Sequence, residues 1–223
     1  MNKTIYIILA LIISSFASIS VDAQKVKSDE DKKYVEVLTK RSNKILDDYV
    51  KMEQGKSRDK VLSIMVKQYW DVNKINDRNK ILLKDKKRQL SREEYEVFKE
   101  KTKNKEEKQL TNLRLNFEKK LSKYLSKEEI ISVKDGITLG AFAHNYNGYL
   151  EMIPSLTVEE KKYIYDQFSE ARDLAMVMSS SKDRLNVFRS YKGKINNWLS
   201  TERGYDLKKE GDAWQERIKS SQQ

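Results

Sequence analysis

Two short segments of this chain concentrate the side chains that could bind or transform a ligand. The first, residues 133–149, contains three of the seven glycines and the only histidine. Glycine permits a close backbone approach or a positive φ, and amides, hydroxyls and aromatic rings are suited to holding a sugar. We therefore take His144, Asn145, Tyr146 and Tyr149 as candidate ligand-binding residues. The alternative is a packed helix or turn whose polar groups are satisfied within the protein.

The second segment runs from Lys192 to Trp198. A glycine inside a helical pattern costs about 1 kcal/mol relative to alanine, so Gly193 predicts that something approaches the backbone closely. That neighbour is either a packed helix or a ligand. If it is a ligand, the candidate binding residues are Lys194, Asn196, Asn197 and Trp198.

Catalysis is the sharper hypothesis for the first segment. A single histidine can act as a general base, so His144 or Tyr146 could abstract a proton from a uronate while Lys134 or Arg172 holds its carboxylate. That chemistry would be a β-elimination. The competing prediction is that His144, which has small and apolar neighbours in the sequence, is a hydrogen-bonded structural residue.

Other site chemistries find less support. A glycosidase needs two carboxylates about 5–10 Å apart, and Asp135 and Glu151 are only nominal candidates. The run 71–77 resembles a calcium loop, but Ile75 and Asn76 stand where an oxygen ligand and a glycine are required. The chain has no cysteine, which excludes thiolate nucleophiles, cysteine-ligated metals and disulfides. We expect no metal ion and no cofactor.

Helices are the elements that would position these residues. Apolar side chains recur at a helical period from Asp31 to Met52, after which Gly55 is expected to cap the helix end and Ser57 to cap the next helix. No glycine or proline occurs between Gly55 and Gly136, which predicts nearly continuous helix. Later stripes predict a helix on each side of 179–181 and a short last helix capped by Asp206.

A helix-start pattern occurs three times. Leucine, then serine or threonine, then a glutamate three residues further on forms a capping box. The caps are expected at Ser91, Ser126 and Thr157. The residues after each cap do not match one another, so we do not interpret the pattern as a structural repeat.

The segment 84–108 stands apart because 17 of its 25 residues are charged. So polar a helix buries little surface, and we expect it to project as a hairpin or arm. The fold class expected from these patterns is all-α. Residues 24–223 should form a single bundle-like domain of about six to eight helices that carries this charged helical arm.

The first 23 residues predict export. A short basic start, an apolar run of about ten residues and Val21-Asp22-Ala23 are typical of a cleaved signal peptide. We therefore expect a soluble protein of the periplasm or the extracellular medium, without a membrane span. The mature chain from Gln24 keeps the net charge of +11. This charge favours anionic partners, and outside the cytoplasm an acidic polysaccharide or oligosaccharide is favoured over nucleic acid. The alternative is that the lysines only solvate helix faces.

The chain resembles the family called domain of unknown function 3826. The segments that carry the resemblance are Val133-Lys134-Asp135-Gly136-x-Thr138, Tyr149–Pro154 with x-Leu156-Thr157-x-Glu159-Glu160-Lys161, Glu170-Ala171-Arg172, Tyr191–Asn197 and Gly204-Tyr205-Asp206-Leu207. The resemblance implies a secreted helical protein of Gram-negative polysaccharide-degrading bacteria, often encoded among pectin- or plant-glycan-utilisation genes. It implies no activity, so no catalytic residue is transferred from it.

Three functions follow from this sequence. The first is a non-catalytic accessory protein that binds an acidic, pectin-type polysaccharide. The second is a uronate lyase or glycosidase. The third is a periplasmic chaperone, because the three caps resemble the Leu-Thr-x-x-Gln motif of Spy-type chaperones, although glutamate replaces the glutamine here.

Overall fold

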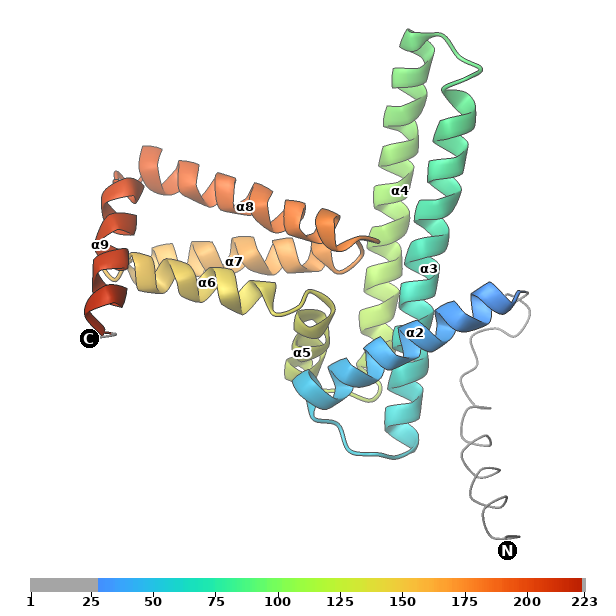
Figure 1. Ribbon diagram of the computed structural model, residues 1–223, viewed down its shortest axis with the longest axis horizontal. Coiled ribbons are helices and arrows are strands. Elements are labelled where there is room, and N and C mark those ends of the chain that lie inside the picture. The colour runs from blue at the N-terminus through green and yellow to red at the C-terminus, as the bar shows by residue number, and fades with distance from the viewer. Residues whose placement is uncertain (1–27, 222–223) are drawn as a thin grey trace, which may run out of the picture. The chain divides into compact units, whose positions relative to one another are not determined.

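A computed structural model describes residues 28–221, and the predicted signal peptide over residues 1–23 lies outside this part of the chain. The described residues contain eight α-helices and one short π-helix and no strand, which confirms the all-α prediction for this range (Figure 1). They form two compact units, one ending at Ile130 and one beginning at Ile131. The prediction of a single domain over 24–223 stays a prediction.

The first unit contains α2 (Asp29–Ile45), the π-helix η1 (Leu46–Val50), α3 (Lys56–Lys86) and α4 (Arg92–Leu121). The helix expected over Asp31–Met52 is thus present, but its last turn is π-helical. Helices α3 and α4 pack side by side as a long hairpin (Figure 1). With 31 and 30 residues, each spans about 45 Å at 1.5 Å per residue.

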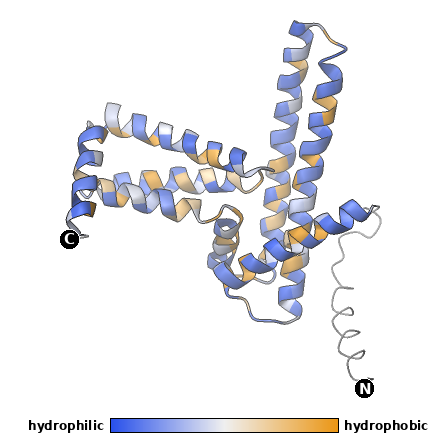
Figure 2. Ribbon diagram, in the orientation of Figure 1, coloured by the Kyte–Doolittle hydropathy of each residue, from blue (hydrophilic) through white to orange (hydrophobic). Residues whose placement is uncertain are grey.

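The core of this unit lies in one half of the hairpin. Buried apolar residues of α3 fall between Val61 and Val72, and those of α4 between Leu110 and Leu121. Nearer the turn, the buried residues of the two helices are Asn79 and Thr102, both polar. Figure 2 shows the corresponding part of α4 mostly in hydrophilic colours. The charged segment 84–108 thus provides the end of α3, the turn and the first half of α4, which agrees with the arm that its composition predicts.

The loop before α3 differs from the prediction. Lys51, not Gly55, has the left-handed conformation that ends the preceding helix, with φ 56°. Gly55 instead is the N-cap residue of α3, and Ser57 lies inside that helix. Arg58 stabilises the loop by donating a hydrogen bond to Asp47 at 2.7 Å.

The second unit contains most of α5 (Lys127–Ile137), then α6 (Ala141–Met152), α7 (Val158–Ala175), α8 (Ser181–Thr201) and α9 (Leu207–Ser221). Helix α7 packs against both α6 and α8, and Figure 1 shows the three running alongside one another. Their shared core is aromatic and aliphatic, with Ile164, Phe168, Ile195 and Leu199 fully buried. Helix α9 has no buried residue.

The three predicted capping boxes are all present. Ser91 accepts a hydrogen bond from the Glu94 amide while Glu94 accepts one from the Ser91 amide. The same reciprocal pair joins Ser126 to Glu129 and joins the Thr157 and Glu160 residues of α7. Asp206 also caps α9 as predicted, by accepting from the Lys209 amide at 3.0 Å.

Candidate functional site

Two of the predicted site residues meet in the core of the second unit. Tyr149 of α6 is 4% exposed, and its hydroxyl donates a hydrogen bond to the side-chain oxygen of Asn196 on α8. The same hydroxyl lies 3.4 Å from the Lys192 carbonyl. Burial raises the pKa of the Tyr149 phenol well above its ordinary value, so this group stays protonated and cannot serve as a base at neutral pH.

The predicted aromatic residues are used for packing. Trp198 stacks on Tyr163 of α7 with ring centroids 3.9 Å apart, and the Arg203 guanidinium lies 5.4 Å from the Trp198 ring. Tyr146 stacks on Phe142 at 5.7 Å and meets Tyr165 edge-on at 5.6 Å. A sugar would need an open ring face, and these neighbours occupy much of that surface.

The remaining predicted residues lie nearer solvent. Asn145 donates to the Ala141 carbonyl of its own helix at 2.7 Å, and the Lys194 ammonium lies 5.4 Å from the Tyr191 ring. Asn197 is exposed. His144 is also exposed and makes no side-chain hydrogen bond within residues 28–221, so the prediction of a hydrogen-bonded structural histidine is wrong. Of its sequence neighbours, Ala143 is exposed as well, whereas Ala141 and Phe142 face the core.

The close neighbour expected at Gly193 is also absent from the described residues. A Cβ at this position would meet no atom within 4 Å. The packed-helix explanation of Gly193 is therefore wrong for this part of the chain, and no described side chain accounts for the glycine at this position.

The two cations considered for holding a substrate carboxylate are bound to acids of the protein. Lys134 of α5 pairs with Asp173 at 2.9 Å, and Arg172 of α7 pairs with Asp135 at 2.9 Å. Both cations are buried, at 7% and 4% exposed. The Arg172 guanidinium also lies 4.6 Å from the Phe142 ring. The two crossed pairs join α5 to α7 and leave neither cation facing solvent.

A second buried network contains residues that the resemblance had highlighted. Glu160, 4% exposed, accepts hydrogen bonds from Arg203 and Tyr205, each at 2.9 Å. Burial alone would raise the pKa of Glu160, but the hydrogen bonds from Thr157, Arg203 and Tyr205 outweigh it and lower the pKa to about 2. This network joins the start of α7 to the α8–α9 turn and has a structural role.

The described residues show no metal centre or membrane-spanning helix. Across residues 28–221, no group of three or more His, Asp or Glu side chains is placed to hold a metal ion. No helix in the same range is both long and apolar enough to cross a bilayer.

The positive charge is concentrated in the first unit. Residues 28–130 contain 28 basic and 20 acidic side chains, a net charge of +8, whereas residues 131–221 contain 14 and 13, a net charge of +1. Residues 80–92, which we call the hairpin tip, hold six basic side chains against the single acid Asp85. The tip therefore carries +5 of the first unit's excess.

The basic side chains of the hairpin tip have no counter-ions among the described residues. No ion pair within residues 28–221 involves Lys80, Lys84, Lys86, Lys87, Arg88 or Arg92. The Lys86 ammonium donates a hydrogen bond to the neutral side-chain amide of Gln89 at 3.0 Å. The charge of the tip is therefore available to an external anion.

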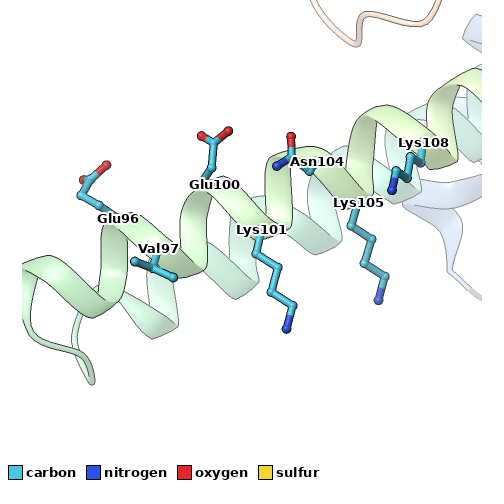
Figure 3. Close-up of a pocket in the computed structure, with 7 residues that line it drawn as sticks. All are labelled: Glu96, Val97, Glu100, Lys101, Asn104, Lys105 and Lys108. Carbon is cyan, nitrogen blue, oxygen red and sulfur yellow. The ribbon is translucent and has the colours of Figure 1, made fainter.

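A second group of lysines lies further along α4, beyond the exposed acids Glu93, Glu94, Glu96 and Glu100. Lys101, Lys105 and Lys108, which we call the lysine flank, are exposed and, like the tip, make no ion pair with any described acid. Other cations of α4 are paired, as Lys99 is with Glu96 at 3.0 Å. The flank borders a hollow of about 740 Å³ whose lining residues all belong to α4, so it is open to solvent (Figure 3). The composition of segment 84–108 indicated an arm but did not distinguish these three lysines from the paired ones.

The fold and these surfaces define an all-α protein with a basic helical hairpin. The model of the family described as "Protein of unknown function (DUF3826)" matches residues 35–220, and the chain belongs to this family. No curated protein matches the chain.

Proposed function

We propose that this protein binds an acidic polysaccharide of the pectin type without cleaving it, and that the hairpin tip is the binding surface. The observation that carries the proposal is the excess of six basic side chains over one acid in residues 80–92, with no ion pair to any described residue. Unneutralised cations at one end of a hairpin attract a polyanion. Export, predicted from residues 1–23, and the setting implied by the family resemblance favour a glycan as that polyanion.

The arrangement supports binding better than catalysis. The cations that a uronate lyase would use, Lys134 and Arg172, are buried in ion pairs. The hollow beside the lysine flank is open, whereas catalytic electrostatics are most effective where water is excluded. The three motifs that suggested a chaperone are accounted for as capping boxes.

The test is affinity electrophoresis of the full chain through gels containing polygalacturonate or a neutral polysaccharide. The tip variant removes three exposed charges by Lys84→Gln, Lys87→Gln and Arg88→Gln. The control variant removes three exposed charges elsewhere on the same unit by Lys119→Gln, Lys120→Gln and Lys123→Gln. Both variants keep good helix formers, so the comparison isolates the position of the charge.

We expect retardation by polygalacturonate but not by the neutral polymer. The tip variant should lose most of this retardation and the control variant little. Retardation should also fall steeply with salt, because exposed charges are screened over about 10 Å at 0.1 M ionic strength. Equal behaviour of the two variants, or equal retardation by both polymers, would contradict the proposal.

Two further measurements separate the alternatives. A single-stranded oligonucleotide that binds as tightly as an oligogalacturonide of equal charge would show that the site has no preference for glycans. The appearance of unsaturated, ultraviolet-absorbing product from polygalacturonate would show a lyase. A variant with Lys194→Gln and Asn197→Ala tests the residues predicted on α8, and loss of binding there instead of at the tip would move the site to the second unit.

A further inference from the structure

We infer that the bound polyanion does not end at the hairpin tip but runs along α4 over the lysine flank, so that the protein selects long chains over short ones. This inference rests on the proposed function, because it extends the same site. It assigns a ligand class by length: a linear polymer that carries carboxylates at regular intervals.

The spacing of the flank supports a track rather than a single point of attachment. Val97, Lys101, Lys105 and Lys108 are separated by four, four and three residues, which places them on one side of α4. Figure 3 shows the Lys101 and Lys105 side chains extending in the same direction, away from Glu96 and Glu100. From the first residue of α4 to Lys108 the helix rises about 24 Å. Residues 92–108 contain six basic and six acidic side chains, so the cations of the flank form a row on one side of a helix that is neutral as a whole.

The hollow beside the flank also continues along the helix. A second hollow, of about 640 Å³, shares Asn104 and Lys108 with the first and is also lined by Glu107, Thr111 and Asn112. Amide and hydroxyl groups can bond the hydroxyls of a sugar, whereas the lysines can pair with its carboxylates. The surface thus offers both kinds of contact to a sugar chain that lies along α4.

Two acids of α4 lie on one side of the helix and the lysine flank on the other, which would orient a bound polymer. Glu96 and Glu100 lie on the other side of the hollow from Lys101 and Lys105 (Figure 3). Like charges repel, so a polymer should lie with its carboxylates on the lysine side and its neutral hydroxyls toward Asn104. The separation of these lysines and acids onto opposite sides of α4 distinguishes this surface from a diffuse solvated face.

The test is fluorescence anisotropy with end-labelled oligogalacturonides of increasing length. The full-length wild type is compared with the tip variant, with the control variant and with a flank variant that combines Lys101→Gln, Lys105→Gln and Lys108→Gln. For the wild type, affinity should rise with length and level off once the ligand spans about 24 Å, the rise from Arg92 to Lys108.

The flank variant should bind the shortest oligomers as the wild type does but should lose about tenfold in affinity for the longest, which corresponds to three exposed ion pairs of ordinary strength. The control variant should keep the full length dependence. A long ligand has more binding registers than a short one, but that advantage is the same for both variants, so their difference reports the flank contacts.

The possible failures are distinguishable. If no oligogalacturonide of any length binds, the proposed function itself is wrong. If short and long oligomers bind equally tightly, or if the flank and control variants behave alike, the track along α4 is wrong while binding at the hairpin tip stands.

Discussion

The buried hydroxyl of Tyr149 donates its hydrogen bond to Asn196, which lies 47 residues further along the chain. The bond joins α6 to α8 across the core that both helices share with α7. Two segments that the sequence marked as ligand-binding are thus joined by a contact that uses up one polar group of each. This geometry favours a structural role for the pair.

The first prediction concerns this pair. Tyr149→Phe removes the hydroxyl and keeps the ring against Phe168, so unfolding free energy should fall by about 1 kcal/mol, the usual net value of a hydrogen bond. Urea denaturation measures the change. Asn196→Ala should have a similar effect, and the double variant should cost less than the sum because the two residues share one bond. Additive losses would show that the bond contributes nothing. Polygalacturonate binding should be unchanged in all three variants.

The second prediction concerns the acid stability that Glu160 provides. The pKa of Glu160 is about 2 in the folded protein, whereas an ordinary glutamate, as in the unfolded chain, has a pKa of 4.5. Because the pKa is lower in the folded state, the ionised Glu160 contributes its full stabilisation above pH 4.5. This contribution disappears as the pH falls from 4.5 toward 2. Glu160→Gln should therefore destabilise the protein by about 1.5–3 kcal/mol near pH 7, as for hydrogen bonds to a charged group.

The measurement for Glu160 is the urea midpoint from pH 7 down to pH 2. The gap between wild type and Glu160→Gln should narrow below pH 4.5 and nearly close by pH 2. Glu159→Gln is the matched control, since the neighbouring Glu159 side chain is 91% exposed. A gap that is constant with pH would indicate that Glu160 contributes only packing.

The third prediction concerns the turn between α5 and α6. Leu139 has φ 59° and is 66% exposed, so its backbone is strained and its side chain gains little burial in return. A left-handed conformation costs a side-chain-bearing residue about 1–2 kcal/mol, and glycine avoids this cost but loses more backbone entropy on folding. Leu139→Gly should stabilise the protein by about 0.5–1 kcal/mol in thermal denaturation. Gly140→Ala, at φ 69°, should instead destabilise it. A lower melting temperature for Leu139→Gly would show that the leucine makes a stabilising contact.

The features predicted correctly from the sequence are those set by near neighbours in the chain. A capping box needs a serine or threonine and a glutamate three residues later, so Ser91, Ser126 and Thr157 could be identified directly. The charged hairpin followed from composition in the same way. The end of the first helix was not predicted correctly, because Lys51 adopts the left-handed conformation that was expected of Gly55.

The positions of candidate site residues were harder to predict because they depend on contacts between distant segments. His144 was expected to be hydrogen-bonded on the strength of its sequence neighbours, but the face that a helix buries is decided by the helices packed against it. The pairing of Lys134 with Asp173 joins residues 39 apart. The charge difference between residues 28–130 and 131–221 could have been counted in advance. Its significance depended on knowing where the two compact units divide and which lysines lack partners.

The last prediction follows from the acids that border the lysine flank. Glu100 is exposed on the side of the α4 hollow opposite Lys101 and Lys105, and it should repel the carboxylates of a polymer lying there (Figure 3). Glu100→Gln should therefore raise affinity for long oligogalacturonides by about two- to threefold at low salt, and the gain should vanish at high salt because exposed charges are screened. Glu36→Gln, an exposed acid on α2, changes the net charge equally and should have little effect. If both substitutions raise the affinity alike, the polymer responds to the net charge of the protein and not to its position on α4.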